Sequence, residues 1–259
     1  MEKKKKLNKR FSALTSFLLA LALLAGTLGA LPAECFAAQP EKAAFHSTYG
    51  FRLGSSAKME LQFRDKLEKN YKVNGNTYYG SQTDLSRQLR DQMVGRSDQV
   101  VLRLATDRRG LTGRSNSAAQ AREELFLGLL NDATAQRNSV SARDGDYLRW
   151  QLGSVSGVLY ADGNKNGIYY YRVIYYGLGY YTTAAEEQWV DRYVQNYVRR
   201  VDRNKMSDYD LAKKVHDDVC RATVYDMEMD SRYDDYDFSA YGCLYVGRCV
   251  CQGYALAYY

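Results

Sequence analysis

The stretch of this chain with the clearest chemical potential is residues 247–255, GRCVCQGYA. Turn-forming residues lead into Cys251, and residues 254–259 after it can form a helix. A thiol at a helix N-terminus faces unpaired backbone N–H groups and the positive end of the helix dipole, and both favour thiolate over thiol. Cys251 is therefore a candidate nucleophile. The structural alternative is a small buried cysteine in a tight turn, because free cysteines are among the most buried residues.

The residues around Cys251 resemble the nucleophile segment of bacterial transglutaminase-like proteins. The matching residues are Ser239-Ala240-Tyr241-Gly242, Leu244, Gly247 and Val250-Cys251-Gln252-Gly253-Tyr254-Ala255. A second match lies upstream, where residues 213–220 (KKVHDDVC) and 224–226 (VYD) are similar to the helix and turn that precede this segment in the family. The resemblance covers residues 183–259. Cys243 and Cys249 depart from it, because the family usually has small or apolar residues there.

The resemblance implies a papain-like arrangement, in which a cysteine, a histidine and an aspartate follow one another along the chain. Cys251 would be the catalytic residue that attacks an amide carbonyl, and water or an amine would resolve the acyl-enzyme. The histidine and the aspartate are expected on strands after the nucleophile helix, and Tyr259 is reached before either. We therefore expect a C-terminally truncated form of a longer enzyme, itself inactive. Its complete parent would hydrolyse or cross-link peptide or amide bonds.

The expected partner of the enzyme is a protein or peptide substrate, with a cell-wall peptide as one candidate, and this chemistry requires no cofactor or metal ion. A second interpretation is a non-catalytic cell-envelope interaction protein, in which residues 38–182 bind a partner and the transglutaminase-like remnant is degenerate. His216 precedes Cys251 in the sequence and lies on the predicted inward face of its helix. This position favours a hydrogen-bonded core histidine over a general base.

The N-terminal residues resemble a targeting signal. Basic residues between Lys3 and Arg10 precede an uncharged apolar run over residues 11–33, and Cys35-Phe36-Ala37 forms a small-x-small cleavage site. This pattern predicts a secretory signal peptide, residues 1–37, and a secreted or cell-surface protein. The alternative is a protein that is membrane-anchored by residues 11–33, because about 20 apolar residues can span a bilayer. Contact with a membrane is expected only through this segment.

Removing residues 1–37 takes away six basic and two acidic residues, so the formal net charge falls from +6 to +2. This charge balance gives no support for nucleic-acid binding. Four of the five cysteines remain, at positions 220, 243, 249 and 251. In a secreted chain these cysteines could form disulfides, and a Cys243–Cys249 bridge would leave Cys251 free.

The fold class predicted for the mature chain is α+β. Residues 38–182 are predicted to form an N-terminal domain that opens with a mobile lead-in over residues 38–54. Apolar residues at helical spacing predict helices around Met59, Phe63 and Leu67, around Leu85, Leu89 and Met93, and from Ser117 to Asn131. A strand is predicted at residues 100–104.

An antiparallel hairpin should follow, with Leu148, Trp150 and Leu152 in its first strand and residues 169–176 in its second. The intervening turn, residues 162–167 (DGNKNG), begins like a calcium loop, but position twelve would be Val173 instead of a bidentate carboxylate. An Asn/Gly hairpin turn is therefore the preferred interpretation.

Residues 183–259 are predicted to be the N-terminal part of a transglutaminase-like domain. Thr183 and Glu186 form a capping box, and an apolar stripe from Trp189 to Val201 predicts a helix that packs in the core. Ser207 should cap the next helix. Its predicted inward residues are Leu211, Ala212, Val215, His216, Val219 and Cys220. The acidic loop with Asp234, Asp235 and Asp237 could bind a cation, although solvated loop acids are more common.

Overall fold

The structure is a computed structural model, and it describes residues 42–48, 69–137, 141–202, 205–227 and 234–259. These residues belong to one compact unit that runs from Pro40 to Tyr259. The predicted signal peptide and the helix predicted around Met59, Phe63 and Leu67 lie outside the described residues. In the part of the chain that is described, no helix is both long and apolar enough to cross a membrane.

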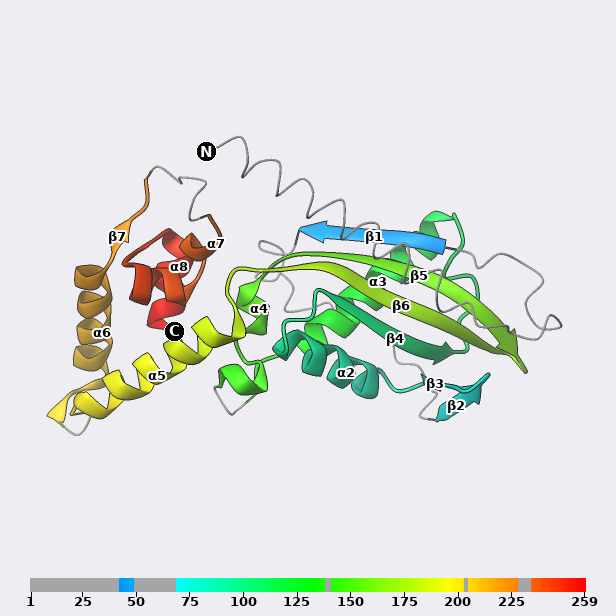
Figure 1. The fold of residues 1–259 in the computed structure, drawn as a ribbon, viewed down its shortest axis with the longest axis horizontal. Helices are drawn as coiled ribbons and strands as arrows, with labels where there is room; N and C mark the ends of the chain where they lie inside the picture. Colours follow the sequence, from blue (N-terminus) through cyan, green and yellow to red (C-terminus); the bar gives the residue numbers. More distant parts are fainter. Residues whose placement is uncertain (1–41, 49–68, 138–140, 203–204, 228–233) are drawn as a thin grey trace, which may run out of the picture. The chain divides into compact units, whose positions relative to one another are not determined.

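The first part of the unit is built on a six-stranded mixed sheet (Figure 1). Its strands are β1 (Lys42–Thr48), β2 (Asn70–Val73), β3 (Asn76–Tyr79), β4 (Gln99–Thr106), β5 (Leu152–Lys165) and β6 (Ile168–Tyr180). They lie in the order β1-β5-β6-β4-β3-β2. The β3–β4 pair is parallel and the other pairs are antiparallel. The sheet and its helices confirm the α+β class, whereas the mobile lead-in predicted over residues 38–54 is wrong for 42–48, which form β1.

The long β5–β6 hairpin confirms the predicted turn. Asn166 and Gly167 have φ angles of 54° and 78°, which suit the two central positions of a tight hairpin turn. The start of the first strand was predicted too early, because Leu148 and Trp150 belong to a one-turn helix, α4 (Leu148–Gln151). An alternating apolar pattern this short does not separate a helical turn from a strand.

Asp162, the first residue of the expected calcium-like loop, is engaged by protein side chains. Its carboxylate accepts hydrogen bonds from Arg172 Nε at 2.7 Å and from the Tyr78 hydroxyl at 2.9 Å. Burial, followed by the charge of Asp162, raises the pKa of Tyr78 well above its usual range. Asp162 therefore joins strands β3, β5 and β6 of the sheet.

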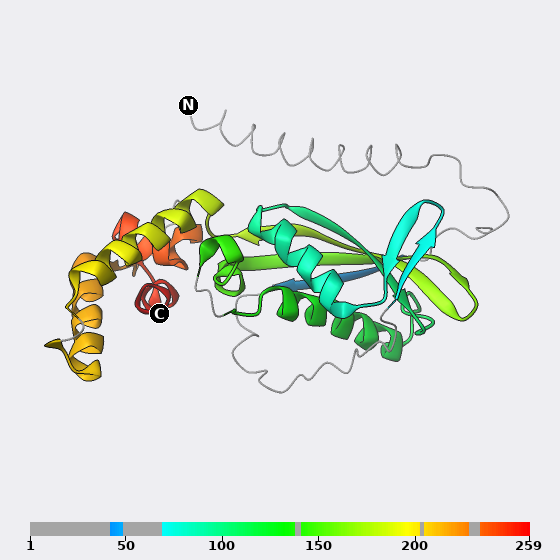
Figure 2. The same ribbon diagram turned by 90° about the horizontal axis from the view of Figure 1, so that it is seen from below.

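Two helices, α2 (Gln82–Val94) and α3 (Asn116–Ala133), pack against each other and against the sheet (Figure 2). Ser81 caps α2, and Leu85, Leu89 and Met93 are buried as predicted. The N-cap of α3 is Ser115, two residues before the predicted Ser117. Both serines can accept a hydrogen bond from the backbone, so the sequence alone does not select between them.

The main core lies between these helices and the inner face of the sheet. Its fully buried residues include Leu89, Leu104, Phe126, Leu130, Leu159, Val173 and Tyr175. The Tyr175 hydroxyl donates to the Phe126 carbonyl at 2.8 Å, so its polar end is satisfied. At Gly157 a Cβ would lie 2.3 Å from the Phe126 ring, which leaves room only for glycine.

The second part of the unit is mainly helical, with one short pair of strands. It contains α5 (Ala184–Arg200), α6 (Asp208–Ala222), α7 (Asp234–Asp237), the π-helical turn η3 (Gly242–Val246) and α8 (Cys251–Tyr258). The capping box of Thr183 and Glu186 is formed, and Ser207 caps α6. Both predicted helix starts are confirmed, because a cap is a local interaction that the sequence specifies directly.

Candidate functional site

Cys251 is the first residue of α8, and its side chain is exposed. The residue before it, Val250, is extended and supplies no side-chain cap. The N–H groups of the first helical turn are therefore not capped by the N-cap side chain, and they lie beside the thiol at the positive end of the helix dipole. The alternative of a buried cysteine in a tight turn does not describe Cys251.

A short parallel strand pair positions the start of α8. Strand β7 (Val224–Tyr225) pairs with β8 (Arg248–Cys249), which leads directly into Cys251. The Val224 N–H donates to the Gly247 carbonyl at 2.9 Å, and the Asp226 N–H donates to the Cys249 carbonyl at 3.0 Å. The structure thus brings together the two sequence segments, 224–226 and 239–255, on which the family resemblance rests.

An ion pair strengthens this junction. Arg248 lies 3.0 Å from the Asp226 carboxylate, and the side chain of Asp226 is 3% exposed. Nearby, the Tyr254 hydroxyl of α8 donates to the Thr223 carbonyl at 2.8 Å. The sequence analysis did not identify this ion pair. The sequence contains one acidic residue, Asp226, in the 224–226 turn and one basic residue, Arg248, directly before Cys249. Nothing in their spacing predicts that they meet.

The first turn of α8 is also held from the α7 side. The Val250 N–H donates to the Asp237 carbonyl at 3.0 Å, and the Gln252 side chain donates to the Phe238 carbonyl at 3.1 Å. Gly253 is buried, and a Cβ there would lie 2.8 Å from the Asp237 carbonyl oxygen. These contacts hold the helix start while Cys251 itself faces solvent.

The sequence predicted that His216 of α6 lies in the core, and this prediction is wrong. The His216 side chain is 66% exposed, and its Nε2 lies 3.6 Å from Cys220 Sγ. Its Nδ1 lies 3.2 Å from the Asp217 carboxylate. Hydrogen bonds from Lys213 and then from His216 lower the pKa of Asp217. Cys220 is likewise exposed, so the predicted inward face of α6 was too wide by these two residues.

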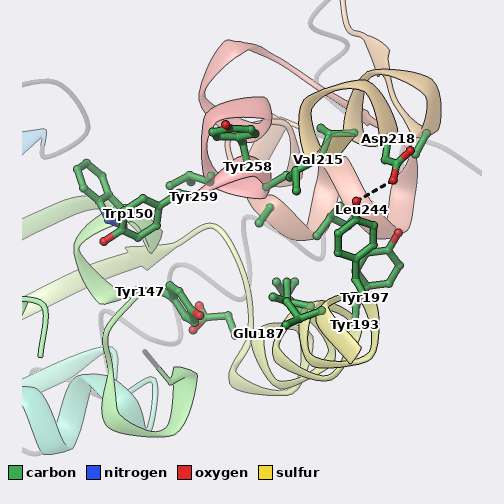
Figure 3. Close-up of a pocket in the computed structure, with 18 of the residues that line it drawn as sticks. Tyr147, Trp150, Glu187, Tyr193, Tyr197, Val215, Asp218, Leu244, Tyr258 and Tyr259 are labelled. Carbon is green, nitrogen blue, oxygen red and sulfur yellow. Dashed lines mark hydrogen bonds between the residues drawn. The ribbon is translucent and has the colours of Figure 1, made fainter. Parts of the chain in front are cut away.

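The apolar stripe of α5 is the second expectation that the structure corrects. Tyr193, Val194 and Val198 are 37%, 38% and 44% exposed, so this face does not form a closed core. Together with residues of α6 and α8 it borders a pocket of about 300 Å³ (Figure 3). Amphipathic spacing identifies the apolar face of a helix, but burial depends on whether another element covers that face.

At one edge of this pocket the Tyr197 hydroxyl donates to the Asp218 carboxylate at 2.7 Å (Figure 3). Burial, with this hydrogen bond, raises the pKa of Tyr197 to about 12. Leu256, Ala257 and Tyr258 of α8 also line this pocket. Cys251 is not among the pocket residues, so the pocket and the exposed thiol are separate features of the same helix.

The acidic residues before Cys251 are not arranged as a cation site. Asp234 and Asp235 are in α7, and Asp237 at its end is buried at 2% exposure. In the described ranges, no group of three or more His, Cys, Asp or Glu side chains is close enough to hold a metal ion. The carbonyl of Asp237 instead receives the Val250 N–H, so this residue supports the start of α8.

Comparison of the chain with family models, with curated proteins and with solved structures found no match.

Proposed function

We propose that Cys251 is the nucleophile of a thiol-dependent acyl-transfer reaction of the transglutaminase-like type. One observation carries the proposal: the first residue of α8 carries an exposed thiol, beside backbone N–H groups that the N-cap residue Val250 leaves uncapped. This is the environment in which a cysteine is activated for attack on a carbonyl. The residue motif around it is the one that resembles the family, and the 224–226 turn lies beside it.

The reaction follows from the chemistry of a thiolate. Cys251 Sγ attacks an amide carbonyl of a protein or peptide, and its own backbone N–H donates to the developing oxyanion. The amine leaves with a proton supplied by a general acid, and a thioester remains on Cys251. Water or a second amine then attacks the thioester, which releases a carboxylic acid or a new amide and restores the thiol.

Turnover also needs a histidine to move the proton and an acidic residue to orient it. His216 is engaged with Cys220 and Asp217 instead. The resemblance places the catalytic histidine and aspartate after the cysteine in chain order. We therefore propose only the nucleophile, Cys251, for this chain.

Alkylation of the full chain with limiting iodoacetamide tests the proposal. Cys220 is a matched internal control, because it is also exposed but lies in the last turn of α6, near the negative end of that helix dipole. We expect Cys251 to be modified about tenfold faster than Cys220, measured by peptide mass spectrometry. A Cys220→Ser variant should leave the Cys251 rate unchanged. Equal rates at both thiols, or faster modification of Cys220, would contradict a nucleophilic role for Cys251.

A non-catalytic interaction protein is the second candidate, and the engagement of His216 with Cys220 favours it. A nitrophenyl ester, which transfers its acyl group without help for the leaving group, separates the two. We expect the acyl group on Cys251 of the wild-type chain and not on Cys251→Ser. An interaction protein whose Cys251 is only structural would release nitrophenol no faster than the Cys251→Ser variant.

A further inference from the structure

The two cysteines that depart from the family resemblance lie together under α8. Cys243 is in the η3 turn and Cys249 is the last residue of β8, and both are 0% exposed. They share one apolar cluster with Val219, against which Tyr254 also packs. Each thiol also acts on the pKa of the other. The two cysteine side chains therefore pack together inside a closed apolar environment.

The backbone holds both positions. The Cys243 N–H donates to the Ser239 carbonyl at 3.3 Å, and the Cys249 carbonyl accepts from the Asp226 N–H at 3.0 Å. Between the two cysteines the chain reverses at Gly247, whose φ of 78° is in the left-handed region that favours glycine. The contact between the thiols is thus a product of a defined turn, and a disulfide requires this kind of proximity.

The hydrogen bonding around the pair distinguishes the two sulfurs. The Thr223 hydroxyl donates to the Cys243 carbonyl at 2.9 Å and lies 3.2 Å from Cys243 Sγ. The hydrogen bond with Cys249 lowers the pKa of Cys243, and the same hydrogen bond raises the pKa of Cys249. Thr223 and the two cysteines therefore belong to one buried polar contact set within the apolar cluster.

We propose that Cys243 and Cys249 form a disulfide when the chain folds in the presence of a disulfide oxidant, and that Cys251 and Cys220 remain thiols. The thiolate of one of the two cysteines attacks a sulfur of the oxidant, which forms a mixed disulfide and releases one thiol. The other cysteine then loses its proton and attacks the protein sulfur of the mixed disulfide, which releases the second thiol of the oxidant. The pair loses two electrons and two protons, and the oxidant disulfide is reduced to two thiols.

The proposal is independent of any catalytic role of Cys251. Burial explains why the bond forms during folding, because an oxidant reaches neither sulfur in the closed cluster. Burial also explains the choice of partners. Cys251 is two residues from Cys249 but points to solvent, and Cys220 is exposed beside His216.

The test is to refold the full chain in oxidised and reduced glutathione, alkylate the remaining thiols with iodoacetamide and map the disulfides without reduction. Trypsin cleaves after Arg248, so Cys243 falls on one peptide, and Cys249 and Cys251 fall on the next. We expect these two peptides to be cross-linked, with the alkyl group on Cys251 and a second alkyl group on Cys220. Alkylation of both Cys243 and Cys249, or a bond from either of them to Cys35, Cys220 or Cys251, would overturn the proposal.

A variant that keeps the buried pair intact gives a second readout. The Cys220→Ser/Cys251→Ser chain changes only exposed thiols, so we expect it to fold and to lose the mass of two hydrogens on oxidation. Its urea midpoint should rise on oxidation and return when the bond is reduced. When Cys243→Ala is added to this double variant, the buried pair no longer exists, and the oxidant should leave the midpoint unchanged. Failure of the double variant to lose the two hydrogens would show that the bond needs Cys220 or Cys251, against the proposal.

Discussion

Gly253 shows how closely α8 is packed directly beneath the exposed thiol. A Cβ at this position would lie 2.5 Å from the Cys249 Cβ and 2.8 Å from the Asp237 carbonyl oxygen. Neither neighbour is the free end of a flexible side chain, so the space cannot be gained by a rotamer change. The residue type at 253 is therefore determined by packing between the helix start and the strand that precedes it.

Gly253→Ala separates this packing from helix propensity, because the two effects have opposite signs. Propensity alone would stabilise the helix by about 1 kcal/mol, whereas overpacking costs about 1–3 kcal/mol. We expect a net loss of up to about 2 kcal/mol in the free energy of unfolding, measured by urea denaturation. The matched control is Ala255→Gly on the exposed face of α8, where only the propensity loss of about 1 kcal/mol applies. A Gly253→Ala chain more stable than the wild type would contradict the close packing.

The start of α5 is attached to the end of α2 by a buried ion pair. Arg96 pairs with Glu187, and the Arg96 Nε donates to the Thr182 carbonyl at 3.2 Å. The Thr182 hydroxyl donates to the Glu187 carboxylate at 2.8 Å. Burial raises the pKa of Glu187, and the charge of Arg96 acts in the opposite direction. The capping box at Thr183 begins the helix, and this ion pair fixes where the helix begins in space.

Arg96→Met should therefore destabilise the protein more at pH 7 than at pH 4. Without the cation, Glu187 holds its proton in the folded state to a higher pH, while in the unfolded chain it ionises near its ordinary pKa. The folded state then binds more protons over a wider range, so the free energy of unfolding falls as the pH rises. We expect Arg96→Met to lower the free energy of unfolding by about 3 kcal/mol at neutral pH and by about 1 kcal/mol at pH 4, measured by urea denaturation.

The control for this variant is Arg87→Met, which removes an exposed ion pair with Asp84. Exposed ion pairs contribute little to stability. The free energy of unfolding of Arg87→Met should therefore differ from that of the wild type by no more than about 0.5 kcal/mol at both pH values. An Arg96→Met loss that is the same at pH 4 and pH 7 would show that the arginine acts only through its hydrogen bonds to backbone carbonyls.

Across the whole molecule, the apolar residues fall into two environments that their sequence patterns do not distinguish. Val155 of β5 is 0% exposed in the closed core between sheet and helices. Val198 of α5 is 44% exposed beside the pocket, although it belongs to the apolar stripe that predicted a core helix. The difference is one of coverage: two helices close over the inner face of the sheet, whereas the stripe of α5 borders a pocket.

Truncating the two valines to alanine compares these environments with an identical loss of atoms. Val155→Ala should cost about 2 kcal/mol, because two buried methyl groups are removed and a cavity remains. Val198→Ala should change the free energy of unfolding by less than about 0.5 kcal/mol, since its methyl groups are half exposed and alanine favours a helix. Both variants are measured by urea denaturation followed by circular dichroism. An equal loss in the two variants would mean that the stripe is covered in solution.

The sequence by itself determined the parts of this protein that depend on neighbouring residues. Four of its features rest on interactions within a few residues. They are the caps at Thr183 and Ser207, the Asn166-Gly167 turn, the buried face of α2 and the helix that begins at Cys251. Such interactions are encoded in residue type and spacing, and they predict elements without reference to the rest of the chain.

Only the tertiary structure decided which surfaces these elements contact. In it His216 is exposed beside Cys220, the apolar stripe of α5 is half exposed, and Cys243 and Cys249 pack in one cluster. It also set the 224–226 turn beside the strand that leads to Cys251. The physical reason is that burial and contact depend on which surfaces from distant parts of the chain cover one another, and periodicity within one segment carries no information about its partner.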